Sequence, residues 1–179
     1  MITPASTSDS ELHHWMGVAL ETAKRGVECG EFPFGAAVYE PGGTLIARAC
    51  NQVRSTCNPS SHAEVNAIAA AASQVGESDL SPYWLVSTAE PCPMCLGAIA
   101  LAGIQYVAYG ASHAVVKESG YGSLGVSGRE LAQQFSSQLF VRGPIRGNEC
   151  VSFMLNNRKR DLLKRELSSH DHSNSRSSA

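Results

Sequence analysis

Ser61-His62-Ala63-Glu64 and Glu90-Pro91-Cys92-Pro93-Met94-Cys95 are the two most informative stretches of this sequence. The first supplies an imidazole with a carboxylate two residues later, and the second supplies two thiols in a C-x-x-C spacing. One imidazole and two thiolates fill three corners of a tetrahedral zinc site and leave the fourth corner for water. An open corner is typical of a catalytic zinc, so we expect His62, Cys92 and Cys95 to hold Zn²⁺.

Each stretch is expected to begin a helix, and this placement suits a metal site. The dipole at a helix N-terminus favours anionic ligands, and the C-x-x-C spacing puts both sulfurs on one face, so both thiols should be ionised. Glu64 lies about 200° around a helix from His62, so it should not ligate the same ion. We therefore expect Glu64 to be the catalytic residue, which takes a proton from zinc-bound water and passes it to the substrate.

Simpler explanations exist for each part of this pattern. Ser61-x-x-Glu64 has the form of a helix capping box, and an isolated histidine such as His62 is more often a hydrogen-bonding partner than a ligand. A C-x-x-C pair also occurs in redox proteins and in structural four-cysteine zinc sites. The joint occurrence of both stretches at two helix starts favours the metal site. A second C-x-x-C is absent among the remaining cysteines, which are Cys29, Cys50, Cys57 and Cys150.

The rest of the chain predicts an α/β fold. Apolar residues from Leu12 to Ala23 follow helical spacing after a capping box at Ser8-x-x-Glu11, and Pro41-Gly42-Gly43 separates two runs that should form a hairpin. Strands that alternate with helices of about ten to fifteen residues indicate a sheet with parallel pairs and helices on both faces. We expect strands at 34–39, 44–50, 83–88, 104–109 and 138–141, helices at 62–75, 92–102 and 148–167, a polar connection at 51–61 and a loop at 119–128.

Length and composition predict one folded domain. The chain has 179 residues, of which 43% are hydrophobic and 17% charged, and we expect a single domain over 1–167 with a disordered polar tail over 168–179. The net charge of −2 differs from the overall positive charge that is typical of a nucleic-acid-binding protein. No stretch approaches the roughly 20 apolar residues of a membrane span, and the start of the chain lacks a signal-peptide core. We therefore expect a soluble, cytoplasmic protein without membrane association.

Further motifs accompany the two stretches, namely Pro33-Phe34-Gly35-Ala36, Asn51 and the continuation of the second stretch to Ala98. Together they resemble the cytidine-deaminase-like superfamily, in the branch of bacterial guanine deaminases, small cytosine deaminases and tRNA wobble-adenosine deaminases. H-x-E followed by P-C-x-x-C is the signature of zinc nucleobase deaminases. The resemblance covers about residues 12–160. It implies a three-layer α-β-α fold with a central five-stranded mixed sheet, a homodimer, and one Zn²⁺ per subunit.

The same resemblance implies substrate contacts. Asn51 would hydrogen-bond the polar edge of the substrate, because an amide offers both a donor and an acceptor. Phe34 would stack on or flank the substrate ring, and Ala63 is a further candidate contact. The simpler alternatives are a turn residue at Asn51 and a core residue at Phe34. Candidates for reading the base in the later loops are His113, Glu118 and Tyr121.

Different motifs in the sequence indicate different substrates. Residues 33–36 and 90–98 are most similar to guanine deaminases, yet the loop at 117–124 departs from the acidic loop of those enzymes, and no aromatic residue follows Phe153. The loop instead resembles that of tRNA adenosine deaminases, and the basic run Arg158-Lys159-Arg160 with Lys164-Arg165 offers contacts for phosphates.

Three functional hypotheses follow from these observations. The first is a zinc-dependent hydrolase that releases ammonia from a free nucleobase or related amino-heterocycle, guanine deaminase-like and so a step in purine catabolism, with cytosine as the alternative base. The second is a tRNA wobble-adenosine deaminase that forms inosine. The third is a zinc-stabilised protein without catalytic activity, in which replacing Glu64 would change no function.

Overall fold

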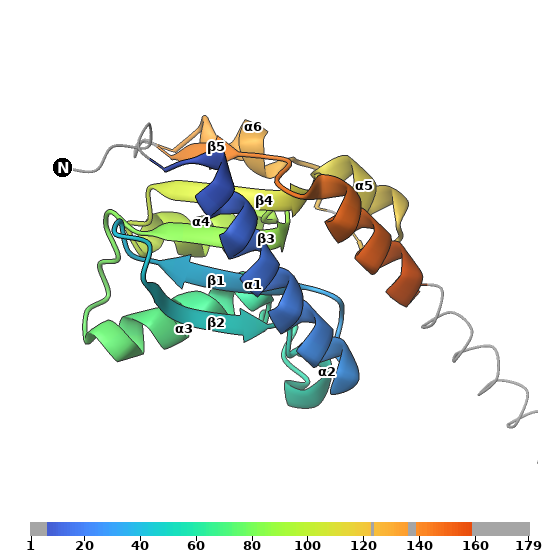
Figure 1. The fold of residues 1–179 in the computed structure, drawn as a ribbon. Coiled ribbons are helices and arrows are strands. Elements are labelled where there is room, and N and C mark those ends of the chain that lie inside the picture. The colour runs from blue at the N-terminus through green and yellow to red at the C-terminus, as the bar shows by residue number, and fades with distance from the viewer. Residues whose placement is uncertain (1–6, 123, 136–138, 159–179) are drawn as a thin grey trace, which may run out of the picture.

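The computed structural model describes residues 7–122, 124–135 and 139–158. The expected tail at 168–179, and with it the domain boundary at 167, lies outside these residues. Within the described part, the chain forms one five-stranded sheet in the order β2-β1-β3-β4-β5 (Figure 1).

Both antiparallel and parallel pairs occur in this sheet. β1 pairs antiparallel with β2 and with β3, whereas β4 pairs parallel with β3 and β5 pairs parallel with β4. This arrangement confirms the predicted hairpin and the predicted mixed sheet. The strands are β1 (Gly35–Tyr39), β2 (Leu45–Cys50), β3 (Trp84–Ala89), β4 (Tyr106–Ala111) and β5 (Phe140–Arg142).

Helices cover the sheet on both faces and complete the predicted three layers. α1 (Asp9–Glu28) and the helical residues 147–158 pack on one face, while α3 (Ala63–Val75) and α4 (Pro93–Leu101) pack on the other (Figure 1). β1, β3 and β4 are buried throughout, as expected for strands with helices on both sides. None of the helices in the described ranges is long and apolar enough to cross a membrane.

Three short helices were not predicted from the sequence. They are 4, 6 and 5 residues long, which is too short to show a helical period. The fifth strand runs from Phe140 to Arg142 rather than over 138–141, and the expected final helix is described only over 147–158. The unpredicted helices are α2 (Val53–Thr56), α5 (His113–Glu118) and α6 (Gly128–Ala132).

The topology brings two of the predicted site residues, Phe34 and Asn51, to one edge of the sheet together with Glu90. Because β1 runs antiparallel to β2 and β3, its start lies beside their ends. Phe34 precedes β1, Asn51 follows β2, and Glu90 follows β3, so all three lie at this edge. The carboxyl ends of strands are the usual place for a ligand site in α/β sheets.

Gly35 allows α1 to pack directly against the start of β1. A Cβ atom at this position would collide with the Ala19 carbonyl oxygen and lie 2.6 Å from the Ala23 backbone nitrogen. We expect Gly35→Ala to lower the free energy of unfolding by about 3 kcal/mol, as measured by urea denaturation, because backbone atoms cannot move aside. Gly97→Ala is the control, because a Cβ atom there meets nothing within 4 Å and alanine favours a helix. Equal losses for both variants would contradict this account of the packing.

Candidate zinc and active site

His62, Cys92 and Cys95 form a compact cluster at this edge of the sheet. The Nδ1 atom of His62 lies 3.8 Å from the sulfur of Cys92 and 3.5 Å from that of Cys95, and the two sulfurs are 3.6 Å apart. In a tetrahedral zinc site with ordinary bond lengths, two sulfurs are about 3.8 Å apart and a sulfur and a nitrogen about 3.6 Å apart. The spacing of the three ligand atoms therefore fits one Zn²⁺ with a fourth position open.

Helix starts position all three ligands. His62 is the N-cap of α3, Cys92 is the N-cap of α4, and Cys95 lies in the first turn of α4 after Pro93. Neither N-cap side chain makes a capping hydrogen bond to the start of its helix, so both stay available to a metal. The alternative of a capping box at Ser61-x-x-Glu64 is wrong, because the N-cap of α3 is His62 rather than Ser61 and it makes no side-chain capping hydrogen bond. The Ser61 hydroxyl donates to the side-chain oxygen of Asn66 at 3.0 Å.

The protein groups alone stabilise only one thiolate. The hydrogen bond with Cys95, followed by that with His62, lowers the pKa of Cys92 to about 4 despite burial. The same hydrogen bond between the two cysteines, together with burial and the nearby Glu64, raises the pKa of Cys95. Both thiols are expected to be ionised in the zinc-bound site, and this expectation stays a prediction. The charge of a bound metal ion is what would ionise the second thiol.

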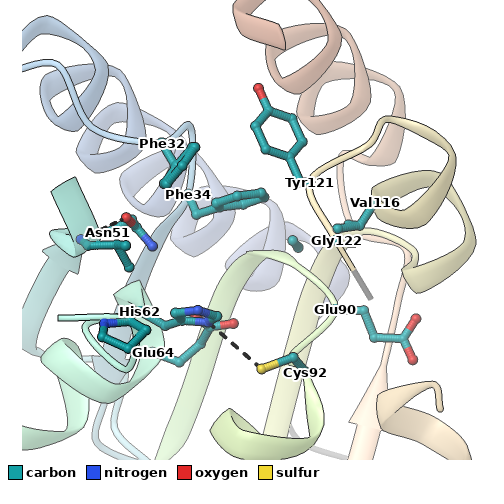
Figure 2. Close-up of a pocket in the computed structure, with 13 residues that line it drawn as sticks. Phe32, Phe34, Asn51, His62, Glu64, Glu90, Cys92, Val116, Tyr121 and Gly122 are labelled. Carbon is teal, nitrogen blue, oxygen red and sulfur yellow. Dashed lines mark hydrogen bonds between the residues drawn. The ribbon is translucent and has the colours of Figure 1, made fainter. Parts of the chain in front are cut away.

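Glu64 lies next to the ligand cluster but is not part of it. It is only 6% exposed, and it lines the same cavity as His62 and Cys92 (Figure 2). The predicted angle of about 200° does not apply, because His62 has an extended N-cap backbone and only Glu64 is helical. Burial raises the pKa of Glu64 above its ordinary value, and the adjacent Cys92 acts in the same direction. A carboxyl group of this kind is suited to exchange protons in a cavity.

The cavity beside the cluster is small and mixed in chemistry. Its volume is about 210 Å³, below the range of roughly 300 to 1,000 Å³ that holds drug-sized ligands. Aromatic rings form one part of the wall, and polar side chains lie at the end near the ligand cluster (Figure 2). The lining residues are Phe32, Phe34, Asn51, Val53, Pro59, His62, Glu64, Ala89, Glu90, Cys92, Val116, Tyr121 and Gly122.

Asn51 and Phe34, the two expected substrate contacts, both line this cavity. Asn51 is 3% exposed, and its side-chain oxygen accepts the backbone N–H of Val53 at 3.1 Å. The amide therefore offers its NH₂ group, a donor, to the cavity. Phe34 is half-buried and also packs against both core clusters, so it serves the core and the cavity together.

Three other candidate contacts lie outside the lining. Ala63, the first residue of α3, is fully buried in the core. His113 begins α5, where its backbone N–H donates to the carboxylate of Glu90 at 2.8 Å, and Glu118 ends the same helix. None of the three is among the residues that line the cavity.

Glu90 has a structural role that the sequence does not predict. Its carboxylate accepts the backbone N–H of His113 at 2.8 Å and that of Arg129 at 3.1 Å, so one side chain joins the starts of α5 and α6. The residue is buried, and it ties the segments after β4 to the loop that carries Cys92. No short-range sequence pattern predicts these hydrogen bonds, because Glu90 is distant in sequence from His113 and Arg129.

We expect Glu90→Ala to lower the free energy of unfolding by about 2 kcal/mol, because it leaves two part-buried backbone N–H groups without their charged acceptor. Glu90→Gln keeps one acceptor oxygen and should cost less. Urea denaturation at a fixed zinc concentration measures both, with the exposed Glu77→Ala as the control. A loss no larger than that of Glu77→Ala would show that the two hydrogen bonds do not hold α5 and α6.

A five-stranded mixed sheet with a His-Cys-Cys cluster and a buried glutamate at its edge defines a zinc-type deaminase domain. The comparison with protein families agrees, since residues 9–111 match the model of the cytidine and deoxycytidylate deaminase zinc-binding region. The chain belongs to this family.

Individual relatives include deaminases of two kinds. Guanine deaminase of Bacillus subtilis is 40% identical over 104 residues, which are 58% of this chain and 66% of the relative. tRNA-specific adenosine deaminases, among them that of Aquifex aeolicus, match over a similar length. The tRNA(Ile)-lysidine synthase of Deinococcus deserti is 35% identical over 156 residues, which are 87% of this chain but 28% of that protein. The chain thus spans about two thirds or less of these curated relatives.

A solved structure supports the fold independently. Guanine deaminase from Nitrosomonas europaea superposes with a TM-score of 0.77 at 24% identity, over 89% of this chain and 86% of that chain. At this sequence identity the match shows that the two proteins share a fold.

Proposed function

We propose that this protein is a hydrolytic deaminase of a free nucleobase or a related amino-heterocycle, with guanine as the first substrate to test. The observation that carries the proposal is that Glu64, His62 and Cys92 line one end of a small, partly aromatic cavity, with Cys95 in the same ligand cluster. A cavity of this size suits a planar ring without a large substituent. The identity to Bacillus subtilis guanine deaminase supports guanine among the bases.

In this proposal His62, Cys92 and Cys95 hold the zinc, which when bound makes a water molecule nucleophilic at neutral pH. Glu64 would take a proton from water and give it to a ring nitrogen, and would then transfer the proton of the added hydroxyl to the departing amine, which leaves a carbonyl group. A C–O bond forms at the amine-bearing carbon and the C–N bond breaks. One water is consumed and one ammonia is released.

Asn51 would orient the base. Its NH₂ group points into the cavity while its oxygen is held by Val53, so it can donate to a carbonyl oxygen or ring nitrogen of the base. Guanine presents both kinds of acceptor. The rings of Phe32, Phe34 and Tyr121 would contact the planar faces or edges of the same molecule.

The second candidate is a tRNA adenosine deaminase. Two arginines next to lining rings favour it, since Arg54 lies over the ring of Phe32 and Arg158 over that of Tyr121. Arginines in these positions offer charge to phosphates beside a flipped base. The relatives that act on tRNA match the chain over a length similar to that of guanine deaminase.

Ammonia release by the zinc-loaded protein tests the proposal. The substrates are guanine, cytosine, adenine, their nucleosides and an unmodified tRNA, with Glu64→Gln as the blank. Glu64-dependent turnover of one free base is the expected result. Inosine in the tRNA without turnover of any small molecule would favour the second candidate, and silence on every substrate would favour a zinc-stabilised protein without activity.

The homodimer and the cytoplasmic location stay predictions. Leu101 ends the apolar helix α4 and is 90% exposed, which makes this helix the first surface to examine for a second copy of the chain. Light scattering of the zinc-loaded protein would measure its oligomeric state.

A further inference from the structure

Tyr121 occupies a loop that the family match, which ends at residue 111, does not include. Glycines flank it on both sides, and both adopt positive φ angles, +75° at Gly120 and +94° at Gly122. These angles favour glycine, so the loop turns sharply on either side of the tyrosine. The turn places the Tyr121 side chain in the wall of the cavity.

The aromatic wall is built around this ring. Tyr121 meets Phe34 edge-to-face, with ring centroids 5.1 Å apart and an interplanar angle of 78°. It meets Phe32 in the same manner, at 6.1 Å and 88°. Edge-to-face contacts of this kind fix the orientation of rings relative to one another. The three rings therefore form one surface rather than three separate contacts.

The helical residues 147–158 hold Tyr121 from the other side. Its hydroxyl donates to the Met154 carbonyl oxygen at 3.2 Å, and the guanidinium of Arg158 lies 5.4 Å from the ring centroid. A Cβ atom at Gly120 would lie 3.2 Å from a guanidinium nitrogen of Arg158, so the glycine also makes room for this contact. The ring is thus positioned by a segment far from the zinc ligands in sequence.

Figure 2 shows Tyr121 on the side of Phe34 that faces away from Glu64 and Cys92. An amine-bearing carbon that reaches Glu64 leaves the rest of its ring system to extend toward Phe34 and Tyr121. We propose that Tyr121 is a specificity-determining residue that contacts a planar free base at the far end of the cavity, and that residues 147–158 hold it there. A sugar on that side of the base would meet the tyrosine ring.

The inference rests on the proposed deamination of a free base, and its test separates the two. The variants are Tyr121→Ala, Tyr121→Phe and Arg158→Ala, assayed with the base that the wild type deaminates best and with its nucleoside. Phe140→Ala is the matched control, because Phe140 is a 39% exposed aromatic residue that stacks on Tyr106 and does not line the cavity. Zinc content and thermal unfolding are measured for every variant.

Tyr121→Ala is expected to raise the KM for the base about 10-fold or more, because contact between a base and an aromatic side chain is commonly worth such a factor. Since Tyr121 lies away from the reacting end, kcat should change less than about 3-fold. The preference for base over nucleoside should fall. Tyr121→Phe keeps the ring and should stay within about 5-fold of the wild-type KM, because it loses only the hydrogen bond to Met154.

A second readout does not depend on turnover. The dissociation constant of the same base, measured by calorimetry on the inactive Glu64→Gln protein, should rise by a similar factor when Tyr121→Ala is added. If Tyr121→Ala does not fold, Arg158→Ala must still raise the KM and the dissociation constant above those of Phe140→Ala. An active wild type with unchanged constants in these variants would overturn the role of Tyr121 and leave the proposed function standing. A wild type that deaminates no free base would overturn both.

Discussion

Glu64→Gln is expected to lower kcat/KM for deamination by about 10³-fold or more while zinc stays bound. Glutamine has nearly the same shape as glutamate but cannot carry a proton between water and the leaving amine, and general acid–base catalysis typically contributes 10²- to 10⁴-fold. Glu64 lies beside the His62, Cys92 and Cys95 cluster without belonging to it, so the metal should remain. Initial rates with the best base and zinc content per subunit measure the two parts of this prediction.

The control for Glu64→Gln is Glu77→Gln. Glu77 is exposed just beyond the end of α3, the helix that carries Glu64, and it does not line the cavity. Its variant should keep full activity. Activity retained in Glu64→Gln would mean that another group moves the proton, and zinc lost from it would mean that Glu64 is a ligand.

The zinc cluster could be predicted because its information is local. His62 and Glu64 lie within one turn of a helix start, as do Cys92 and Cys95, so spacing alone brings each pair to one place. The topology that joins the two pairs follows from the alternation of strands and helices, which short-range patterns also show. The backbone at His62 was less predictable, because an N-cap residue departs from the helical angles assumed for it.

The contacts that hold Tyr121 and Glu90 in place could not be predicted in the same way. The Tyr121 side chain is held by residues 147–158, and the Glu90 carboxylate accepts hydrogen bonds from the starts of α5 and α6. These contacts join segments that are far apart in sequence. Their local signals are weak, since α5 and α6 have 6 and 5 residues and the loop at 120–122 shows only glycines around a tyrosine. In the proposed role of Tyr121, substrate selection depends on these long-range contacts, so the sequence indicates the chemistry more clearly than the substrate.

Cys92→Ser is expected to reduce zinc content from about one ion per subunit to nearly none after dialysis against a weak chelator. The variant removes one of three protein ligands, and a serine hydroxyl is a poor substitute for the thiolate that Cys92 readily forms. Cys57→Ser is the control, because Cys57 is exposed and lies outside the ligand cluster. It should bind zinc as the wild type does.

The loss of zinc should also appear in stability. An ion that binds only the folded protein stabilises it by about 4 kcal/mol when present at 1,000 times its Kd. For a chain of this size, that corresponds to a rise in Tm of roughly 8 to 16 °C. The rise should be present in the wild type and in Cys57→Ser, absent in Cys92→Ser, and reversed by a strong chelator. Glu64→Gln should keep the zinc-dependent rise in Tm and lose the activity, whereas Cys92→Ser should lose both. The two variants therefore distinguish residues that bind the metal from a residue that acts in catalysis. An equal rise in Cys92→Ser would place the metal site elsewhere.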